Sequence, residues 1–122
     1  MQGFRQLIVW QKAHELTIEV YGVTARFPRE ELYALTSQLK RAAASIGANI
    51  AEGCGRGSDA DFARFLLIAM GSASELEYHL LLAHDLRFLT KETYAGLNAR
   101  TTEVKRMLAS LISKTRTKSA AG

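Results

Sequence analysis

Hydrophobic residues recur every three or four positions along four stretches of this sequence, and none of these stretches alternates with the two-residue period of a strand. This spacing gathers apolar side chains on one face of a helix, so it predicts an all-α fold. The predicted helices span residues 6–27, 30–53, 58–86 and 90–114. Short connections between successive helices favour an antiparallel, up-down-up-down four-helix bundle. We expect a single domain over residues 1–114 and a disordered polar tail over residues 115–122.

Turn and cap residues mark the expected helix ends. Pro28 ends the first helix, because the residue before a proline is disfavoured in the helical conformation. Gly53 indicates a left-handed stop for the second helix. Ser58 and Thr90 each offer a hydroxyl to the first free amides of the third and fourth helices.

The third predicted helix carries more apolar residues than a lone bundle can cover. Beside its core stripe it has six further apolar residues on other faces, namely Phe65, Leu67, Ile68, Met70, Leu81 and Leu82. A helix that is apolar nearly all round is buried nearly all round, so this surplus predicts self-association. The alternative is a set of scattered surface hydrophobes, which are common on folded proteins.

Polar residues lie at helical spacing along the second and third predicted helices. They are Gln38, Arg41, Ser45, Asn49, Glu52, Ser72 and Glu75. If the two helices fold back at the glycine-rich turn, Arg41 comes level with Glu75, and a guanidinium can donate two parallel hydrogen bonds to a carboxylate. We interpret this polar cluster as a structural one that fixes helix register or subunit contacts, in preference to a catalytic one.

Composition and motifs narrow the classes of function. With 122 residues, 48% of them apolar, the chain can bury one core. The single Cys54 forms no internal disulfide and no secretory leader pattern opens the chain, so we expect a cytoplasmic location. The longest apolar run falls far short of the ~20 residues that span a bilayer, so no membrane role is expected.

Catalytic and metal-binding patterns are not found in the sequence. A di-iron bundle needs Glu-x-x-His on two helices, and this chain has none. Cys54 has no histidine close in sequence to serve as its base. The glycine-rich segment from Gly53 to Gly57 follows a helix and not a strand, which argues against a dinucleotide fingerprint. We expect no enzymatic activity, no metal and no cofactor.

Positive charge is concentrated in the last third of the chain. The net charge is +4, but eight basic and only two acidic residues lie from Leu86 onward. The candidate nucleic-acid-binding residues are Arg100, Lys105, Arg106, Lys114, Arg116 and Lys118, with Arg56 beside the free amides that open the third helix. Such a surface attracts phosphate backbones at long range. The alternatives are a solvated helix face and a turn that only reverses the chain.

Two motifs resemble those of a known family. The segment from Ser45 to Gly53 matches the pattern SI-x-x-NIAEG, and the segment from Phe62 to Leu76 matches F-x-x-FL-x-x-A-x-GS-x-x-EL. Both are similar to the four-helix-bundle proteins encoded in intervening sequences of bacterial 23S ribosomal RNA genes. The resemblance implies a bundle that assembles into a ring. A related accessory protein of diversity-generating retroelements forms a pentamer and binds nucleic acid and a reverse transcriptase.

Taken with the charge pattern, the resemblance favours a non-enzymatic accessory protein. It would assemble with itself, for which the resemblance implies a pentamer, and bind structured RNA, DNA or a nucleic-acid enzyme through a basic surface. The alternative is a homo-oligomeric protein-interaction scaffold that does not bind nucleic acid directly. The fourth helix has no interleaved aromatic residues to stack unpaired bases, so sequence-specific readout is not expected.

Overall fold

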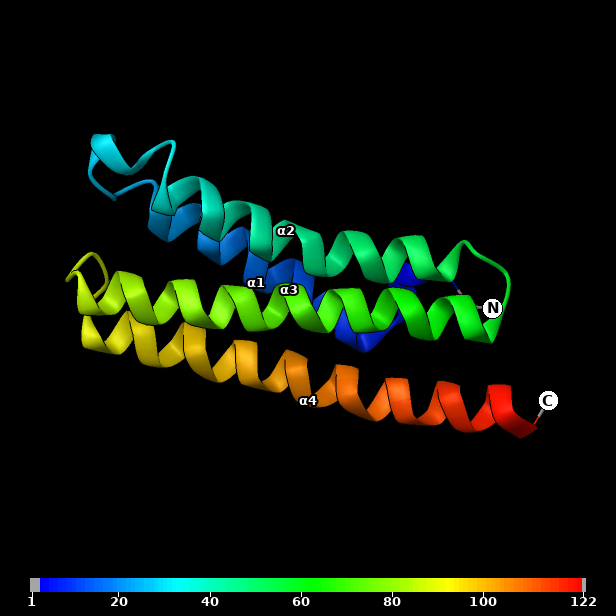
Figure 1. Cartoon of the computed structure of the whole chain (residues 1–122). Helices are drawn as coiled ribbons and strands as arrows, with labels where there is room; N and C mark the ends of the chain where they lie inside the picture. The colour runs from blue at the N-terminus through cyan, green and yellow to red at the C-terminus, as the bar shows by residue number, and fades with distance from the viewer. Residues whose placement is uncertain (1–2, 122) are drawn as a thin grey trace.

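The computed structural model describes residues 3–121 as a bundle of four α-helices with two short 3-10 segments and no strand in that range (Figure 1). The α-helices are α1 (Ile8–Thr24), α2 (Leu35–Cys54), α3 (Asp59–Asp85) and α4 (Lys91–Ala121), and the 3-10 segments are η1 (Phe4–Gln6) and η2 (Arg29–Glu31). The all-α prediction with four helices is confirmed.

One hydrophobic core runs through the bundle. The helix α3 packs against α2 and against α4, and α1 contacts α2 and α4. The stripe predicted for the third helix is buried throughout, and the largest fully buried side chains come from all four helices: Leu16, Leu39, Ile46, Ile50, Leu66, Leu76, Leu80 and Leu108. Thr101 is buried among them without an unmet donor, because its hydroxyl donates to the Leu97 carbonyl at 2.8 Å.

The two ends of the bundle differ in what they gather. The C-terminal end of α2, the N-terminal end of α3 and both chain termini lie at one end (Figure 1). The α1–α2 and α3–α4 connections lie at the other end, where the rings of Phe27 and Phe88 pack with centroids 5.5 Å apart. Segments from the start, middle and end of the chain therefore share the first of these ends.

The second helix begins later than expected. The prediction put its start at residue 30, whereas α2 begins at Leu35. The chain first makes a 3-10 segment closed by short-range bonds such as Leu32 N–H to the Arg29 carbonyl, 3.0 Å. Leu32, which the predicted bounds placed inside this helix, is consequently 46% exposed.

Gly53 plays a different part from the one predicted. It lies inside α2 and is not a left-handed stop, because the positive φ at this turn belongs to Gly57, at 84°. A Cβ at position 53 would sit 2.9 Å from both the Phe62 ring and the Phe65 Cβ. Glycine is needed there because two helices approach closely.

The expected disordered tail over residues 115–122 is wrong up to Ala121, since α4 continues to that residue. Gly122 lies outside the described residues. The helix continues because its buried stripe does: Ile112 and Thr115 are both only 6% exposed, and the Thr115 hydroxyl donates to the Leu111 carbonyl at 2.7 Å. The helical period of the buried positions thus continues past residue 114, where the prediction ended the helix.

The apolar surplus of α3 divides into covered and open parts. Phe65 is buried, and Met70 and Leu82 pack partly against the core, while three of the six residues stay exposed: Leu67, Ile68 and Leu81. By length and composition α3 is the one described helix that passes for a membrane span, but core helices pass the same test and its main stripe faces the other helices.

Candidate nucleic-acid interface

The six basic residues of α4 that were predicted to bind nucleic acid fall into two groups. Three of them have a carboxylate partner on a neighbouring helix, and we call them the paired set. The pairs are Arg100 with Glu19, Lys105 with Glu77 (Nζ to Oε1, 3.0 Å) and Lys118 with Asp59 (Nζ to Oδ2, 4.0 Å). These cations are partly neutralised by the bundle itself, which reduces what they can offer to an external anion.

Arg106, Lys114 and Arg116 form the unpaired set. All three side chains are exposed, and none makes an ion pair within the part of the chain that the structure describes. Lys114 borders a groove against the start of α1, and Arg116 borders a second groove beside Leu67 of α3. Of the six candidates on α4, the unpaired set is therefore the part whose positive charge faces solvent without a partner among the described residues.

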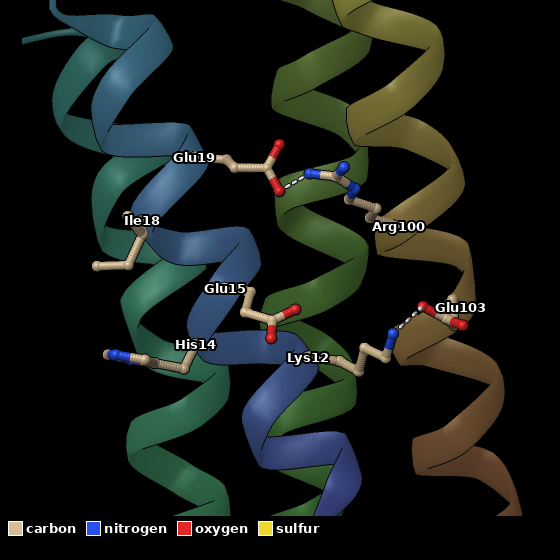
Figure 2. A pocket seen from close by; sticks show the side chains of 7 residues that line it. All are labelled: Lys12, His14, Glu15, Ile18, Glu19, Arg100 and Glu103. Atoms are coloured by element: carbon tan, nitrogen blue, oxygen red, sulfur yellow. Dashed lines mark ion pairs between the residues drawn. The ribbon is translucent and has the colours of Figure 1, made fainter.

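A hollow of about 430 Å³ opens between α1 and α4 (Figure 2). The Arg100–Glu19 pair and a second pair, Lys12 Nζ to Glu103 Oε1 at 3.8 Å, bridge it. Glu15 also lines it, so the hollow holds three carboxylates against two cations. A phosphate entering it would meet more negative than positive charge, which makes Arg100 a poor candidate for direct contact.

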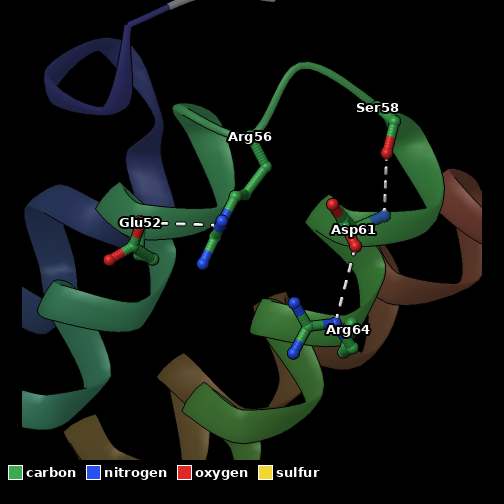
Figure 3. Close-up of polar contacts among 5 residues, drawn as sticks. All are labelled: Glu52, Arg56, Ser58, Asp61 and Arg64. Carbon is green, nitrogen blue, oxygen red and sulfur yellow. Dashed lines mark hydrogen bonds and ion pairs between the residues drawn. The ribbon is translucent and has the colours of Figure 1, made fainter.

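Arg56 lies at the turn between α2 and α3 together with an arginine that sequence reasoning missed. The Arg56 guanidinium sits over the Phe65 ring, 4.9 Å from its centroid, and Arg64 sits over the same ring at 4.5 Å. Each also contacts a nearby carboxylate: Arg56 contacts Glu52 of α2, and Arg64 contacts Asp61 of α3 (Figure 3). The signal in the sequence was a phenylalanine beside one arginine and within reach of another.

The free amides that open α3 are a weaker phosphate site than expected. The Ser58 hydroxyl accepts from the Asp61 amide at 3.2 Å, so that donor is already bonded (Figure 3). The carboxylates of Asp59 and Asp61 also occupy the first turn, where they interact favourably with the helix dipole and repel another anion. Phosphate binding at this turn would therefore depend on the arginine side chains.

The polar cluster on α2 and α3 is only partly assembled as predicted. The hydroxyls of Ser45 and Ser72 lie 2.8 Å apart across the two helices, and the Asn49 amide donates to the Ser45 carbonyl at 2.8 Å. The Arg41–Glu75 pair is absent from the described residues. Arg41 instead donates to Gln38 Oε1 at 2.7 Å, because that acceptor lies one turn away on the same helix.

The surroundings of Glu52 and Cys54 show what each side chain contacts and how reactive the thiol is. Glu52, predicted within the polar cluster, lies with its Oε2 3.6 Å from Arg56 Nε. Burial raises the pKa of the Cys54 thiol above its ordinary value, so the side chain stays protonated and weakly nucleophilic at neutral pH. Within the described range, no three histidine, cysteine, aspartate or glutamate side chains gather as metal ligands would.

Comparison with known proteins places the chain in a family. The family model described as 23S rRNA-intervening sequence protein matches residues 5–110. A crystal structure of a protein of unknown function from the S23 ribosomal protein family of Bacteroides thetaiotaomicron is 33% identical, with a TM-score of 0.81 over 87% of this chain and 96% of that chain. No match was found among curated proteins. The chain belongs to the 23S rRNA-intervening sequence protein family, as its two motifs indicated.

Proposed function

We propose that this protein is a non-enzymatic accessory protein that binds structured RNA or DNA, or an enzyme acting on nucleic acid, through a basic surface on α4. The observation that carries the proposal is the unpaired set: Arg106, Lys114 and Arg116 are exposed and meet no carboxylate among the described residues. Cations that no carboxylate neutralises can bind phosphates and release the counterions condensed on the nucleic acid, and this release supplies most sequence-independent affinity.

Self-association would strengthen this surface. We propose that the bundle, with its helices in antiparallel up-down order, is the subunit of a homo-oligomeric ring, and the family resemblance suggests five subunits. Four large apolar side chains of α3 support the proposal by their exposure: Leu67, Ile68, Tyr78 and Leu81, each between 42% and 58% exposed. A ring repeats the unpaired set around its circumference, so a modest charge per subunit becomes a strong local field.

The test of this function is the salt dependence of binding to nucleic acid. Fluorescence anisotropy would follow a labelled RNA hairpin and a labelled DNA duplex at about 50 mM and about 200 mM salt. We expect tight binding at the lower salt that weakens at least about tenfold at the higher. Absence of binding at about 50 mM salt would refute the nucleic-acid role, since electrostatic contacts are strongest there.

A second candidate function is a protein-interaction scaffold whose product is the assembly itself. The exposed apolar residues of α3 favour it independently of charge. Light scattering separates the outcomes: a mass several times the 13.5 kDa of one chain, with no nucleic-acid binding, would support the scaffold. A mass of one chain at micromolar concentration would remove the ring from both proposals.

A further inference from the structure

Two arginines from different elements are held against a single aromatic ring. Arg56 lies in the turn after α2 and Arg64 in the second turn of α3, and their guanidinium carbons lie 4.9 and 4.5 Å from the Phe65 centroid. Phe65 is itself only 8% exposed and is fixed against Gly53 of α2. A rigid ring that attracts both cations keeps them in place before any ligand arrives.

The ion pairs of these arginines leave the same edge of each guanidinium open. Glu52 contacts Arg56 through Nε at 3.6 Å, and Asp61 contacts Arg64 through Nε at 3.5 Å. Within the described residues, the terminal nitrogens of both groups make no hydrogen bond to the protein, and Figure 3 shows a contact only at each Nε. That edge can offer two parallel N–H donors to a phosphate.

We propose that Arg56 and Arg64 form a two-arginine fork that grips the phosphodiester backbone of a nucleic acid. The fork rests on the proposed function and names a contact point for it beyond α4. Two cations held around one ring repel each other, and a single exposed carboxylate beside each offsets this only in part. A phosphate bound between the open edges removes that repulsion and accepts charge-assisted hydrogen bonds from both sides.

The fork lies at the same end of the bundle as the last turns of α4. The turn after α2 and the start of α3 share that end with the C-terminus (Figure 1). The contact between Lys118 Nζ and Asp59 Oδ2, 4.0 Å, ties the two regions together. A nucleic acid that contacts the last turns of α4 and the fork would meet both at this end of the molecule.

The experiment compares two double variants that each remove two positive charges. The first is Arg56→Gln with Arg64→Gln. The control is Arg26→Gln with Arg29→Gln, two exposed arginines at the opposite end that make no ion pair within the described residues. Anisotropy with the RNA hairpin should show at least about a tenfold loss for the first and a salt slope reduced by about two, against a small loss for the control. Equal losses in the two variants would overturn the fork.

A charge-conserving variant separates the fork from plain electrostatics. Arg56→Lys with Arg64→Lys keeps both charges but lacks the planar pair of donors and stacks less well on Phe65. We expect it to stay several-fold weaker than the wild type, and full recovery of affinity would overturn the fork. Displacement of the hairpin by inorganic phosphate at matched ionic strength would assign the site to free phosphate and overturn it too.

The same measurements distinguish this inference from the function beneath it. Failure of the wild type to bind the hairpin at low salt defeats the proposed function and the fork together. Tight wild-type binding with no special loss at Arg56 and Arg64 defeats the fork alone. Circular-dichroism melting of each variant checks that the bundle is intact, and the lysine variant gives a result even where the glutamine variant is destabilised.

Discussion

The contact between α2 and α3 and the contact between α1 and α4 are built in opposite ways. Across α2 and α3, Gly53 lies so close to Phe62 and Phe65 that no Cβ fits, and the hydroxyls of Ser45 and Ser72 are 2.8 Å apart. Across α1 and α4 there is a hollow of about 430 Å³, bridged by ion pairs between exposed side chains. We call the α2–α3 contact the close seam, because its side chains pack tightly, and the α1–α4 contact the open seam, because ion pairs bridge its hollow.

This difference decides which cations remain available. A close-packed seam uses apolar and small polar groups, so it leaves the charge of its neighbours unchanged. A seam held by ion pairs engages the basic side chains that border it, and Arg100 is engaged in this way by Glu19. On α4, the cations with no such engagement are those beyond the reach of the bundle's own carboxylates, and the sequence does not distinguish the two kinds.

The largest change in stability is expected from adding a side chain at Gly53, where the close seam has no space for one. Gly53→Ala places a methyl group 2.9 Å from Phe62 and Phe65, so the two helices must separate, and we expect a loss of about 2 kcal/mol in the free energy of unfolding. Urea denaturation measures it. Gly96→Ala is the matched control, because open space surrounds Gly96 on α4 and alanine should stabilise the helix by about 0.5–1 kcal/mol. Equal effects of the two changes would contradict the close contact.

A smaller loss is expected from the hydroxyl pair in the same seam. Ser45→Ala leaves the Ser72 hydroxyl without its partner and removes one acceptor of the Asn49 amide, so we expect a cost of about 1 kcal/mol. A double-mutant cycle with Ser72→Ala should give a coupling energy of about 0.5–1 kcal/mol. Glu75→Gln serves as the control and should change stability by less than about 0.5 kcal/mol, since Glu75 is exposed. A zero coupling between the two serines would argue that the bond does not fix the seam.

The open seam should respond weakly and only at low salt. Arg100 and Glu19 are 54% and 39% exposed, so their coupling energy in a double-mutant cycle should be no more than about 0.5 kcal/mol. Raising the salt concentration to about 1 M should abolish this coupling, because the Debye length falls to about 3 Å. The serine coupling should persist in the same salt. A coupling between Arg100 and Glu19 that survives high salt would mean that this seam is closer-packed than its hollow suggests.

The smallest effect concerns the thiol at the end of the close seam. Burial raises the pKa of Cys54, so the contribution of the protonated thiol to stability is fully present below the ordinary thiol pKa and is lost as pH rises through the raised value. Alkylation by iodoacetamide near pH 8.5 should be several-fold slower in the native protein than in urea, because the native thiolate fraction is smaller. Equal rates in the two states would contradict the shielding of this residue.

The fold was predictable because its signal is local. Every residue of the apolar stripe that the helical period predicts for the third helix is buried: Phe62, Leu66, Ala69, Ala73, Leu76, Leu80 and Ala83. The errors come from information that the period does not carry. The position of Gly53 depends on where a second helix approaches it, and the length of α4 depends on whether Ile112 and Thr115 find a neighbour to pack on.

For the candidate site, the sequence predicted which charged residues are present but not which of them are paired. The concentration of charge on the fourth helix was evident, but the division into paired and unpaired sets depends on carboxylates roughly 28 to 80 residues away in the chain, such as Glu77 and Glu19. Arg64 was missed for a related reason. Its partner Arg56 is in another element, and only the fold brings both onto the Phe65 ring.

The most direct test of the account is a comparison of the two sets of cations on α4. One triple variant changes Arg106, Lys114 and Arg116 to glutamine, and the other changes Arg100, Lys105 and Lys118 to glutamine. Both remove three positive charges, so long-range attraction falls alike and only local contacts differ. We expect hairpin affinity by anisotropy at low salt to fall at least about tenfold further in the unpaired triple than in the paired triple. Equal losses, or a greater loss in the paired triple, would contradict the account.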